Sequence, residues 1–212
     1  MYNDLLEQLE LLYNDIQFSD INLLKDYLVE KDSASDSEVM VHVLSYNSYY
    51  KWNYCLGKLL KPKSILSIGV RFGYDTIATV LGSKIENTFV FGIDNECYEP
   101  DSNLITARSF RQLGINFILL KGDSIDSAKF YSMTEQFDLA YVDGNHVDPN
   151  LIRQDLEVAY ASVKDNGVIA VDDYSFIEDV RIAVDIFVDE FKLNSYAVLS
   201  PKHRRGVKII VK

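Results

Sequence analysis

The chain has two parts that differ in the periodicity of hydrophobic and polar residues. In residues 3–17 and 20–30, leucine, isoleucine and tyrosine recur every three or four positions, which predicts two amphipathic helices. Residues 47–60 continue this helical spacing and are followed by Lys61-Pro62, which ends a helix. Residues 31–38 are small and polar without periodicity, which is typical of a loop. The first part of the chain is therefore expected to be helical.

From Ser64 onward, short runs rich in β-branched and aromatic residues alternate with helical stretches. The runs read SILSI, TFVFGI, NFILLK, FDLAYV and GVIAVD, and the helical stretches lie near residues 74–82, 101–113, 124–133, 149–164 and 175–191. This alternation is typical of parallel strands joined by crossover helices. The last two runs, SYAVLS and GVKIIVK, are joined by a turn too short for a crossover, so they predict an antiparallel hairpin.

These patterns predict an α/β protein with a doubly wound sheet. Residues 61–212 are expected to form the sheet domain, and residues 1–60 a helical addition that contributes substrate or oligomer contacts. A chain of 212 residues is close to the usual size of one domain and large enough to bury a core without disulfides. The aromatic residues of the helical addition are compatible with a homo-oligomer.

Charge and composition exclude several classes of protein. The chain has 21 basic and 32 acidic residues, a net charge of −11, which would repel nucleic acid or an anionic membrane surface. Cys55 and Cys97 have no metal-ligand spacing and are typical of reduced thiols. No apolar run approaches the ~18 residues that span a bilayer, and the start lacks a basic signal region. We therefore expect a cytoplasmic protein without nucleic-acid or membrane partners.

The residues that end the predicted strands are acidic or rich in glycine. In an open parallel sheet, ligands bind outside the carboxyl ends of the strands. Any one of the acidic residues there could simply cap a helix, as Asp148 is expected to do before Pro149. Asp172 and Asp173 are adjacent, however, and only one of them could cap. The five strand ends are Gly69-Val70-Arg71-Phe72-Gly73, Asp94-Asn95, Gly122-Asp123-Ser124, Asp143-Gly144-Asn145-His146 and Asp172-Asp173.

The glycine loop argues against a dinucleotide. In a pyrophosphate-binding loop the middle glycine lets the backbone approach the phosphates, and Arg71 stands at that place. The surrounding carboxylates would repel phosphates, but they suit a cationic ligand with free ribose hydroxyls. Asp94 could accept hydrogen bonds from two of these hydroxyls. This description fits S-adenosylmethionine (SAM) better than NAD.

The same residues resemble the class I SAM-dependent methyltransferases over about residues 60–212. ILSIGVRFGYDT looks like the first motif of that family, FGIDNE the second, KGDS the third and FDLAYVDGNH the fourth. Ser67 stands where the family usually has an acidic residue. The resemblance implies a Rossmann-like sheet of seven strands with the last strand antiparallel. It also implies that the cofactor is bound by Gly69, Val70, Arg71, Gly73, Asp94, Asn95, Asp123, Ser124 and Asp143.

A second set of acidic residues indicates a metal ion. A hydroxyl is a poor nucleophile at pH 7, and a divalent cation can position it while a base removes its proton. Asp143, Asp172 and Asp173 end neighbouring strands, and carboxylate oxygens suit Mg²⁺. The arrangement resembles that of metal-dependent O-methyltransferases. This resemblance implies that the three aspartates bind magnesium and that His146 and Asp143 are catalytic residues. The alternatives are a helix cap for the aspartate pair and a structural histidine.

Two further segments have open roles. The tyrosine-rich residues 45–54 are typical of a core, although their hydroxyls could also line a substrate pocket. The basic turn of residues 202–205 is either a solvated hairpin tip or an anchor for a carboxylate or phosphate of the substrate. His42 and His203 are expected to pack or to lie at the surface.

The patterns and the resemblance together predict a SAM-dependent O-methyltransferase that uses Mg²⁺. Its expected partner is a small-molecule hydroxyl acceptor, such as a sugar, a polyol or a natural product. Two alternatives stay open. One is an NAD-binding Rossmann-like oxidoreductase, against which Arg71 argues. The other is a non-catalytic protein that keeps the fold as a scaffold.

Overall fold

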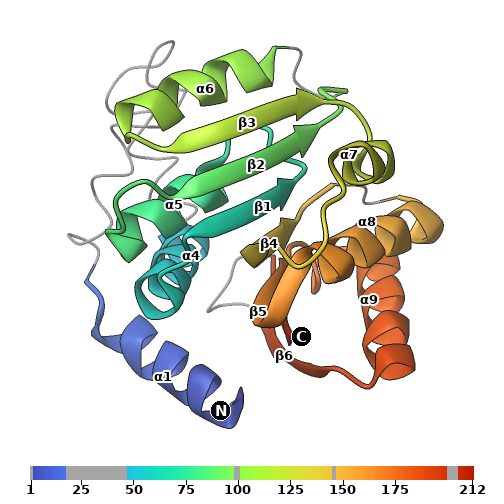
Figure 1. The fold of residues 1–212 in the computed structure, drawn as a ribbon. Coiled ribbons are helices and arrows are strands. Elements are labelled where there is room, and N and C mark those ends of the chain that lie inside the picture. Colours follow the sequence, from blue (N-terminus) through green and yellow to red (C-terminus); the bar gives the residue numbers. More distant parts are fainter. Residues whose placement is uncertain (1, 18–46, 98–100, 145–146, 200–204) are drawn as a thin grey trace.

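A seven-stranded sheet with helices on both faces forms the protein (Figure 1). The computed structural model describes residues 2–17, 47–97, 101–144, 147–199 and 205–212. The strand order is β3-β2-β1-β4-β5-β7-β6, and β7 is antiparallel to both of its neighbours. The predicted sheet and its terminal hairpin are therefore confirmed. The strands are β1 (Ser64–Ile68), β2 (Phe89–Asp94), β3 (Asn116–Lys121), β4 (Phe137–Val142), β5 (Val163–Val171), β6 (Asn194–Val198) and β7 (Val207–Val211).

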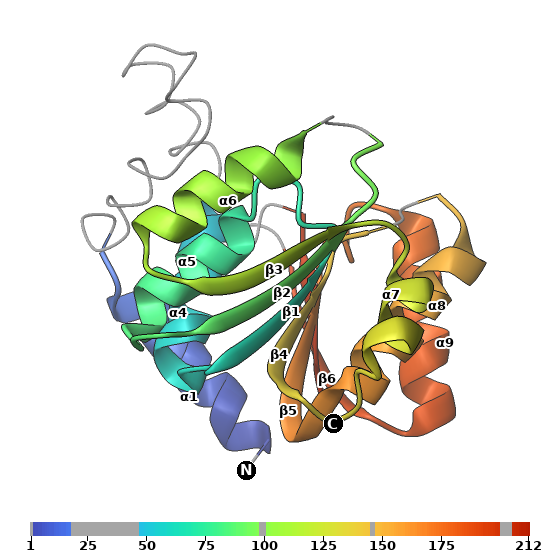
Figure 2. The same cartoon turned by 45° about the horizontal axis from the view of Figure 1, so that its top comes forward.

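The helices form two layers, one on each face of the sheet, as Figure 2 shows from a second direction. One layer holds α1 (Tyr2–Asp15), α4 (Asn47–Leu60), α5 (Tyr74–Ser83) and α6 (Ser102–Gln112), and the other α7 (Ser124–Tyr131), α8 (Pro149–Ser162) and α9 (Glu178–Phe191). Alternate residues of the central strands point to opposite faces, so Ile65 and Tyr141 pack in the first core and Leu66 and Val142 in the second. The core therefore has two halves, separated by the sheet.

Helix α4 packs against α5 with their backbones in close contact. A Cβ atom on Gly57 would lie 2.0 Å from the carbonyl oxygen of Thr79, and one on Gly82 would lie 2.0 Å from that of Tyr54. Glycine is thus required at both positions. This close packing fixes the later turns of α5 relative to α4.

The N-terminal helix α1 packs against α4 and also contacts β6. The rings of Tyr13 and Trp52 lie 5.2 Å apart, and Tyr196 Oη donates a 2.6 Å hydrogen bond to Glu10 Oε1. The helix predicted over residues 20–30 lies outside the described residues, and self-association of residues 1–60 stays a prediction.

The predicted helix boundaries agree with the structure to within about three residues, and one strand begins earlier than predicted. Asp148 caps α8 by accepting a 2.9 Å hydrogen bond from the amide of Asn150. Strand β5 begins at Val163, four residues before the predicted run, because the buried Val163 already pairs with Phe137 ahead of a register shift in β4. Among the described residues, no helix is long and apolar enough to cross a membrane.

Candidate functional site

Three neighbouring strands end in register at the carboxyl edge of the sheet. Ser67 of β1 is the Cα partner of Tyr141 of β4, and Tyr141 is the partner of Ala170 of β5. Side chains of a strand face the same side at every second residue, so the next positions on this face are Gly69, Asp143 and Asp172. This face is the one covered by α4 and α5, because Tyr141 and Ala170 belong to the core that those helices share.

The glycine loop after β1 crosses closely over the end of β4. Gly69 has a φ of +79°, and a Cβ atom there would lie 2.0 Å from the carbonyl oxygen of Asp143. The amide of Asp143 donates a 2.8 Å hydrogen bond to the carbonyl of Ile68. Gly73 also has a positive φ and packs against the ring of Phe110. Glycine is therefore required at both ends of the loop.

Asp94, at the end of β2, holds this loop in place. Its Oδ2 accepts a 2.7 Å hydrogen bond from the amide of Arg71, and its Oδ1 accepts a 2.6 Å hydrogen bond from the amide of Glu96. Thr106 Oγ1 donates to the carbonyl of Arg71 from the other side at 2.7 Å. A carboxylate offers about four acceptor positions, so Asp94 keeps capacity for ligand hydroxyls.

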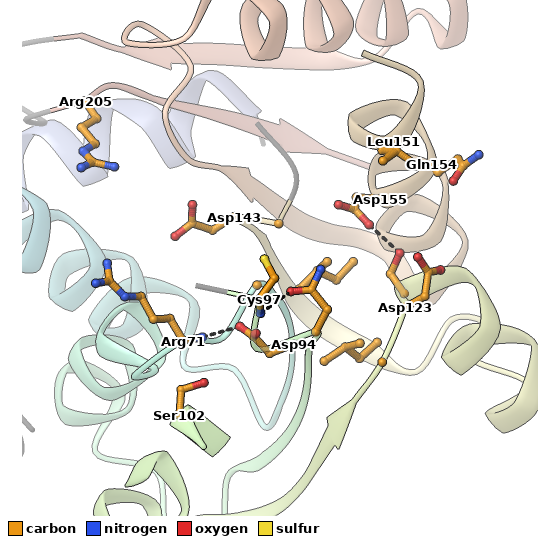
Figure 3. A pocket seen from close by; sticks show the side chains of 17 residues that line it. Arg71, Asp94, Cys97, Ser102, Asp123, Asp143, Leu151, Gln154, Asp155 and Arg205 are labelled. Atoms are coloured by element: carbon orange, nitrogen blue, oxygen red, sulfur yellow. Dashed lines mark hydrogen bonds between the residues drawn. The ribbon is translucent and has the colours of Figure 1, made fainter. Parts of the chain in front are cut away.

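A cavity of about 510 Å³ opens at this edge of the sheet. That volume is typical of a small-molecule site. Figure 3 shows Arg71, Arg205 and Asp143 at one end of the cavity, Asp94 and Cys97 near its middle, and Asp123 with Asp155 at the other end. The predicted cofactor residues that line it are Gly69, Arg71, Asp94, Asn95, Asp123, Ser124 and Asp143.

Two predicted cofactor residues, Val70 and Gly73, are not among the residues that line the cavity in the described part of the chain. Val70 is buried, and its Cγ2 lies 2.7 Å from the position of a Cβ atom on Gly92. These two residues therefore support the loop without facing the cavity. Val70 packs beneath the loop, and Gly73 provides its turn.

At the Asp123 end of the cavity, two predicted residues are already engaged with the protein. Asp123 caps α7 by accepting a 2.9 Å hydrogen bond from the amide of Ile125. Ser124 Oγ donates a 2.5 Å hydrogen bond to Oδ1 of Asp155, a buried residue of α8. A Cβ atom on Gly144 would lie 2.5 Å from Asp155 Oδ2. The sequence analysis missed Asp155, whose signal is an acidic residue on the apolar face of α8.

Ser102 is a second residue that the sequence analysis missed. It lies in the first turn of α6, is 1% exposed and lines the cavity. Its hydroxyl has no hydrogen-bond partner among the described residues. A buried hydroxyl without a partner costs free energy, so this oxygen is a candidate for contact with a ligand.

The two adjacent aspartates after β5 have different surroundings. Asp173 is 1% exposed, has a φ of +57°, and both of its carboxylate oxygens accept from Nη1 of Arg205 at 3.2 Å. Asp172 instead follows Ala170 by two residues, on the sheet face that carries Tyr141 and Asp143. Neither side chain caps the next helix, because α9 begins after Ile177. The helix-cap alternative for this pair is therefore wrong.

The predicted magnesium ligands do not fit a shared ion in this arrangement. Both carboxylate oxygens of Asp173 accept from Arg205, so this side chain is engaged with the guanidinium and not with Asp143 and Asp172. In the part of the chain that the structure describes, no group of three or more histidine, cysteine, aspartate or glutamate side chains is suited to hold a metal ion. His146, the predicted base, lies outside the described residues, as do His42, His203 and residues 202–204 of the basic turn.

Negative charge is concentrated under the glycine loop. Burial raises the pKa of Asp172 well above its usual range, and the neighbouring Asp143 and Asp173 raise it further. Burial raises the pKa of Asp75 to about 7, and the charge of Asp143 adds to this effect. Burial also raises the pKa of Tyr49, which lies near the same three carboxylates, Asp75, Asp172 and Asp143. A cationic group bound here would lower the cost of burying these carboxylates.

Comparisons with known proteins identify the same region. The model of a family described as a methyltransferase domain matches residues 66–174, just over half of the chain. No curated protein matches the sequence.

Solved structures share the fold at low sequence identity. An O-methyltransferase from Bacillus cereus, in complex with S-adenosylhomocysteine (SAH), is 17% identical with a TM-score of 0.59, and the match covers 92% of this chain and 100% of that one. The O-methyltransferase TomG from Streptomyces achromogenes, involved in tomaymycin synthesis and solved with SAM, is 16% identical with a TM-score of 0.61, over 90% and 89% of the two chains. The SAH-bound methyltransferase PaMTH1 from Podospora anserina is 18% identical with a TM-score of 0.56, and the match covers 99% of this chain and 88% of that one.

Proposed function

Because the chain belongs to the methyltransferase domain family, we propose that it transfers a methyl group from SAM to a hydroxyl group of a small molecule. The observation that carries this proposal is the cavity at the carboxyl edge of the sheet, with Asp94 at its middle and the glycine loop above it. The O-methyltransferases from Bacillus cereus and Streptomyces achromogenes, which have the same fold, were solved with SAH and SAM.

The two ends of the cavity would hold different parts of the cofactor. Asp123 and Ser124, at one end, would hold adenine, and Asp94, in the middle, would accept hydrogen bonds from the ribose hydroxyls. Arg71 and Asp143, at the other end, would hold the methionine part. This direction is supported by the negative charge at the Asp143 end, which suits the positive sulfonium and ammonium groups.

The reaction is an in-line displacement at the methyl carbon. The acceptor oxygen forms a bond to this carbon while the carbon–sulfur bond breaks, and the electron pair of that bond stays on sulfur to give SAH. The protein contributes by holding the two reactants in line. The hydroxyl proton passes to His146, the base that the sequence predicts three residues after Asp143.

We assign no step of the proposed reaction to Mg²⁺, because Asp173 is bound to Arg205 and no group of side chains suited to hold a metal ion is found among the described residues. The dependence on Mg²⁺ that the sequence predicts is instead tested directly. Activity that persists in a chelator would remove the ion from the account, and activity that returns only with Mg²⁺ would require Asp173 to leave Arg205.

The acceptor class is a sugar, a polyol or another natural product. The acidic lining of the cavity supports a neutral or cationic acceptor over a phosphorylated one. The role of TomG in tomaymycin synthesis supports the choice of a natural product.

The experiment is transfer of a labelled methyl group from SAM to a panel of hydroxylated small molecules, with and without a chelator. We expect label in at least one hydroxyl compound, with a mass gain of one methylene group in the product. Asp94→Ala should abolish the signal at low SAM concentration, whereas Asp126→Asn, an exposed change on α7, should leave it unchanged. SAM binding without transfer to any hydroxyl compound would contradict the acceptor class.

A further inference from the structure

Strand β3 forms one edge of the sheet, and its apolar side chains are not fully covered. Among the described residues it pairs with β2 alone, and α6 and α7 lie on opposite faces of the sheet beside it (Figure 1). None of its four consecutive apolar residues, 117–120, is buried. The strand at the other edge, β6, has the shorter and more polar sequence NSYAV. An exposed apolar edge strand is a template for pairing with a further strand.

The main chain of β3 presents hydrogen-bonding groups at this edge. Alternate residues of a parallel strand bond to the same neighbour. The amides of Asn116 and Gly122 donate toward β2 at 3.1 and 2.9 Å. Phe117, Leu119 and Lys121 therefore direct their N–H and C=O groups away from β2. In the part of the chain that the structure describes, these groups have no hydrogen-bond partner.

An apolar strip lies beside the edge on the α7 face. The ring of Tyr131 lies 5.1 Å from that of Phe91, which is the Cα partner of Ile118. The ring of Phe130 lies 4.9 Å from that of Tyr131. Ile118 is 37% exposed, Tyr131 41% and Phe130 80%. Contiguous exposed apolar side chains of this kind mark interaction sites.

The α6 face of the same edge is basic. Phe117 and Leu119 point to this face and pack at the border of the first core. The guanidinium of Arg111 lies over the ring of Phe117 at 5.7 Å, and Arg108 lies one turn earlier on the same side of α6. No carboxylate of the described residues forms an ion pair with Arg111. The edge is thus apolar beside α7 and cationic beside α6.

We propose that the β3 edge binds an extended segment of a partner protein, added to the sheet as a further antiparallel strand in which apolar and acidic residues alternate. The main chain of that segment bonds to the outward groups of β3. Its side chains point alternately to the two faces, so its apolar residues lie on Ile118, Tyr131 and Phe130. Its carboxylates lie on the other face, opposite Lys121 and beside Arg111.

A second copy of this chain is a poorer occupant of the edge. Antiparallel pairing of two β3 strands about Leu119 would place Lys121 of each copy opposite Phe117 of the other, beside its Arg111. Like charges at such positions destabilise a strand pair. An acidic strand replaces this repulsion with attraction, so charge complementarity favours a different protein as the partner.

The probe is the synthetic peptide acetyl-Glu-Val-Glu-Val-Glu-Val-Glu-amide, titrated into the protein by calorimetry. We expect a dissociation constant on the order of 100 μM or lower. Phe130→Ser and Arg111→Glu should each raise it about fivefold or more. Ile186→Ser removes an apolar side chain that is 55% exposed on α9, so it is the matched control and should leave the constant unchanged. A peptide with lysine in place of glutamate should bind about tenfold more weakly.

Hydrogen exchange separates strand addition from other binding. With the peptide bound, the amides of Phe117, Leu119 and Lys121 should exchange about tenfold or more slowly, whereas that of Ile118, which faces β2, should change little. A peptide N-methylated at its glutamates cannot donate to β3 and should not bind. These comparisons use the unaltered protein, so they stand even if a variant does not fold.

The outcomes decide between the occupants. No binding at millimolar peptide, or binding that neither the two substitutions nor N-methylation weakens, would overturn the proposal. A dimer of the protein alone that protects the same amides would overturn it in favour of a second copy. Phe130→Ser should leave SAH binding unchanged, which keeps this test independent of the proposed methyl transfer.

Discussion

The main-chain amide of Arg71 donates a 2.7 Å hydrogen bond to Oδ2 of Asp94, which ties the loop after β1 to the end of β2. One carboxylate therefore fixes the shape of the glycine loop and offers its remaining acceptor positions to the cavity. Both roles depend on the negative charge, because hydrogen bonds to an ionised acceptor are about twice as strong as neutral ones.

Asp94→Asn should weaken cofactor binding without unfolding the protein. The amide keeps one acceptor oxygen but loses the charge, and hydrogen bonds to charged groups contribute about 1.5–3 kcal/mol each. We expect the dissociation constant of SAH to rise by about tenfold to a hundredfold in a calorimetric titration. An unchanged constant would show that Asp94 does not contact the ribose.

Gly69→Ala and Gly114→Ala form a matched pair of substitutions at positive φ. A Cβ atom at Gly69 meets the carbonyl of Asp143 at 2.0 Å, whereas one at Gly114 meets nothing within 4 Å. Gly114→Ala should cost only the left-handed strain of about 1–2 kcal/mol. Gly69→Ala should lower the free energy of unfolding further and abolish SAH binding. Urea unfolding measures both, and equal losses would contradict the close approach of the loop to β4.

Ser102→Ala should lower cofactor affinity while leaving stability unchanged or slightly higher. The hydroxyl lines the cavity and has no partner among the described residues, so its removal costs the free protein no hydrogen bond. A loss of affinity for SAH of about fivefold to tenfold is expected for one neutral hydrogen bond. A lower thermal midpoint with unchanged affinity would assign the hydroxyl to the fold instead.

The two cysteines should differ sharply in reactivity. Cys97 is exposed at the cavity, whereas Cys55 is fully buried and burial raises its pKa to about 12. The thiolate is the reactive form, so an alkylating reagent should label Cys97 in the native protein and leave Cys55 unmodified. SAH should slow the labelling. Labelling at the same rate with and without SAH would remove Cys97 from the binding site.

Asp172→Ala should lower turnover far more than cofactor affinity. Asp172 is buried beside Asp143, which lines the end of the cavity where the methyl group would be transferred, so its loss should affect the reacting groups more than the cofactor contacts. Steady-state rates with saturating SAM and a calorimetric SAH titration measure the two effects separately. Equal loss of both, or no loss, would contradict a role in the transfer step.

Much of the fold was predictable because its signals are local. The alternation of apolar runs with helical stretches gave the strand order along the chain, and Asp148-Pro149 predicted the start of α8. The glycine loop was predictable for the same reason, since positive φ at Gly69 and Gly73 is a property of single residues.

The remaining features of the site depend on contacts between distant parts of the chain. Asp173 binds Arg205, 32 residues away, and Ser124 binds Asp155, 31 residues away. The sequence placed Asp143, Asp172 and Asp173 at adjacent strand ends that could converge on one ion, and it carried no signal for the ion pair between Asp173 and Arg205.

Asp75 was missed for a different reason. Its neighbour in sequence is a glycine loop, and an aspartate in the first turn of a helix is ordinarily explained by the helix dipole. Only the packing of α5 on β4, through the hydrogen bond between Thr79 and Tyr141, brings this side chain into electrostatic contact with Asp143. Such a contact is a property of tertiary packing.

Calorimetric titration of the purified protein with SAH, with NAD as the control ligand, tests the central claim most directly. The account predicts micromolar binding of SAH, no measurable binding of NAD, and a loss of SAH binding in Asp94→Ala. Binding of NAD in place of SAH, or of neither ligand, would contradict a SAM-dependent methyltransferase.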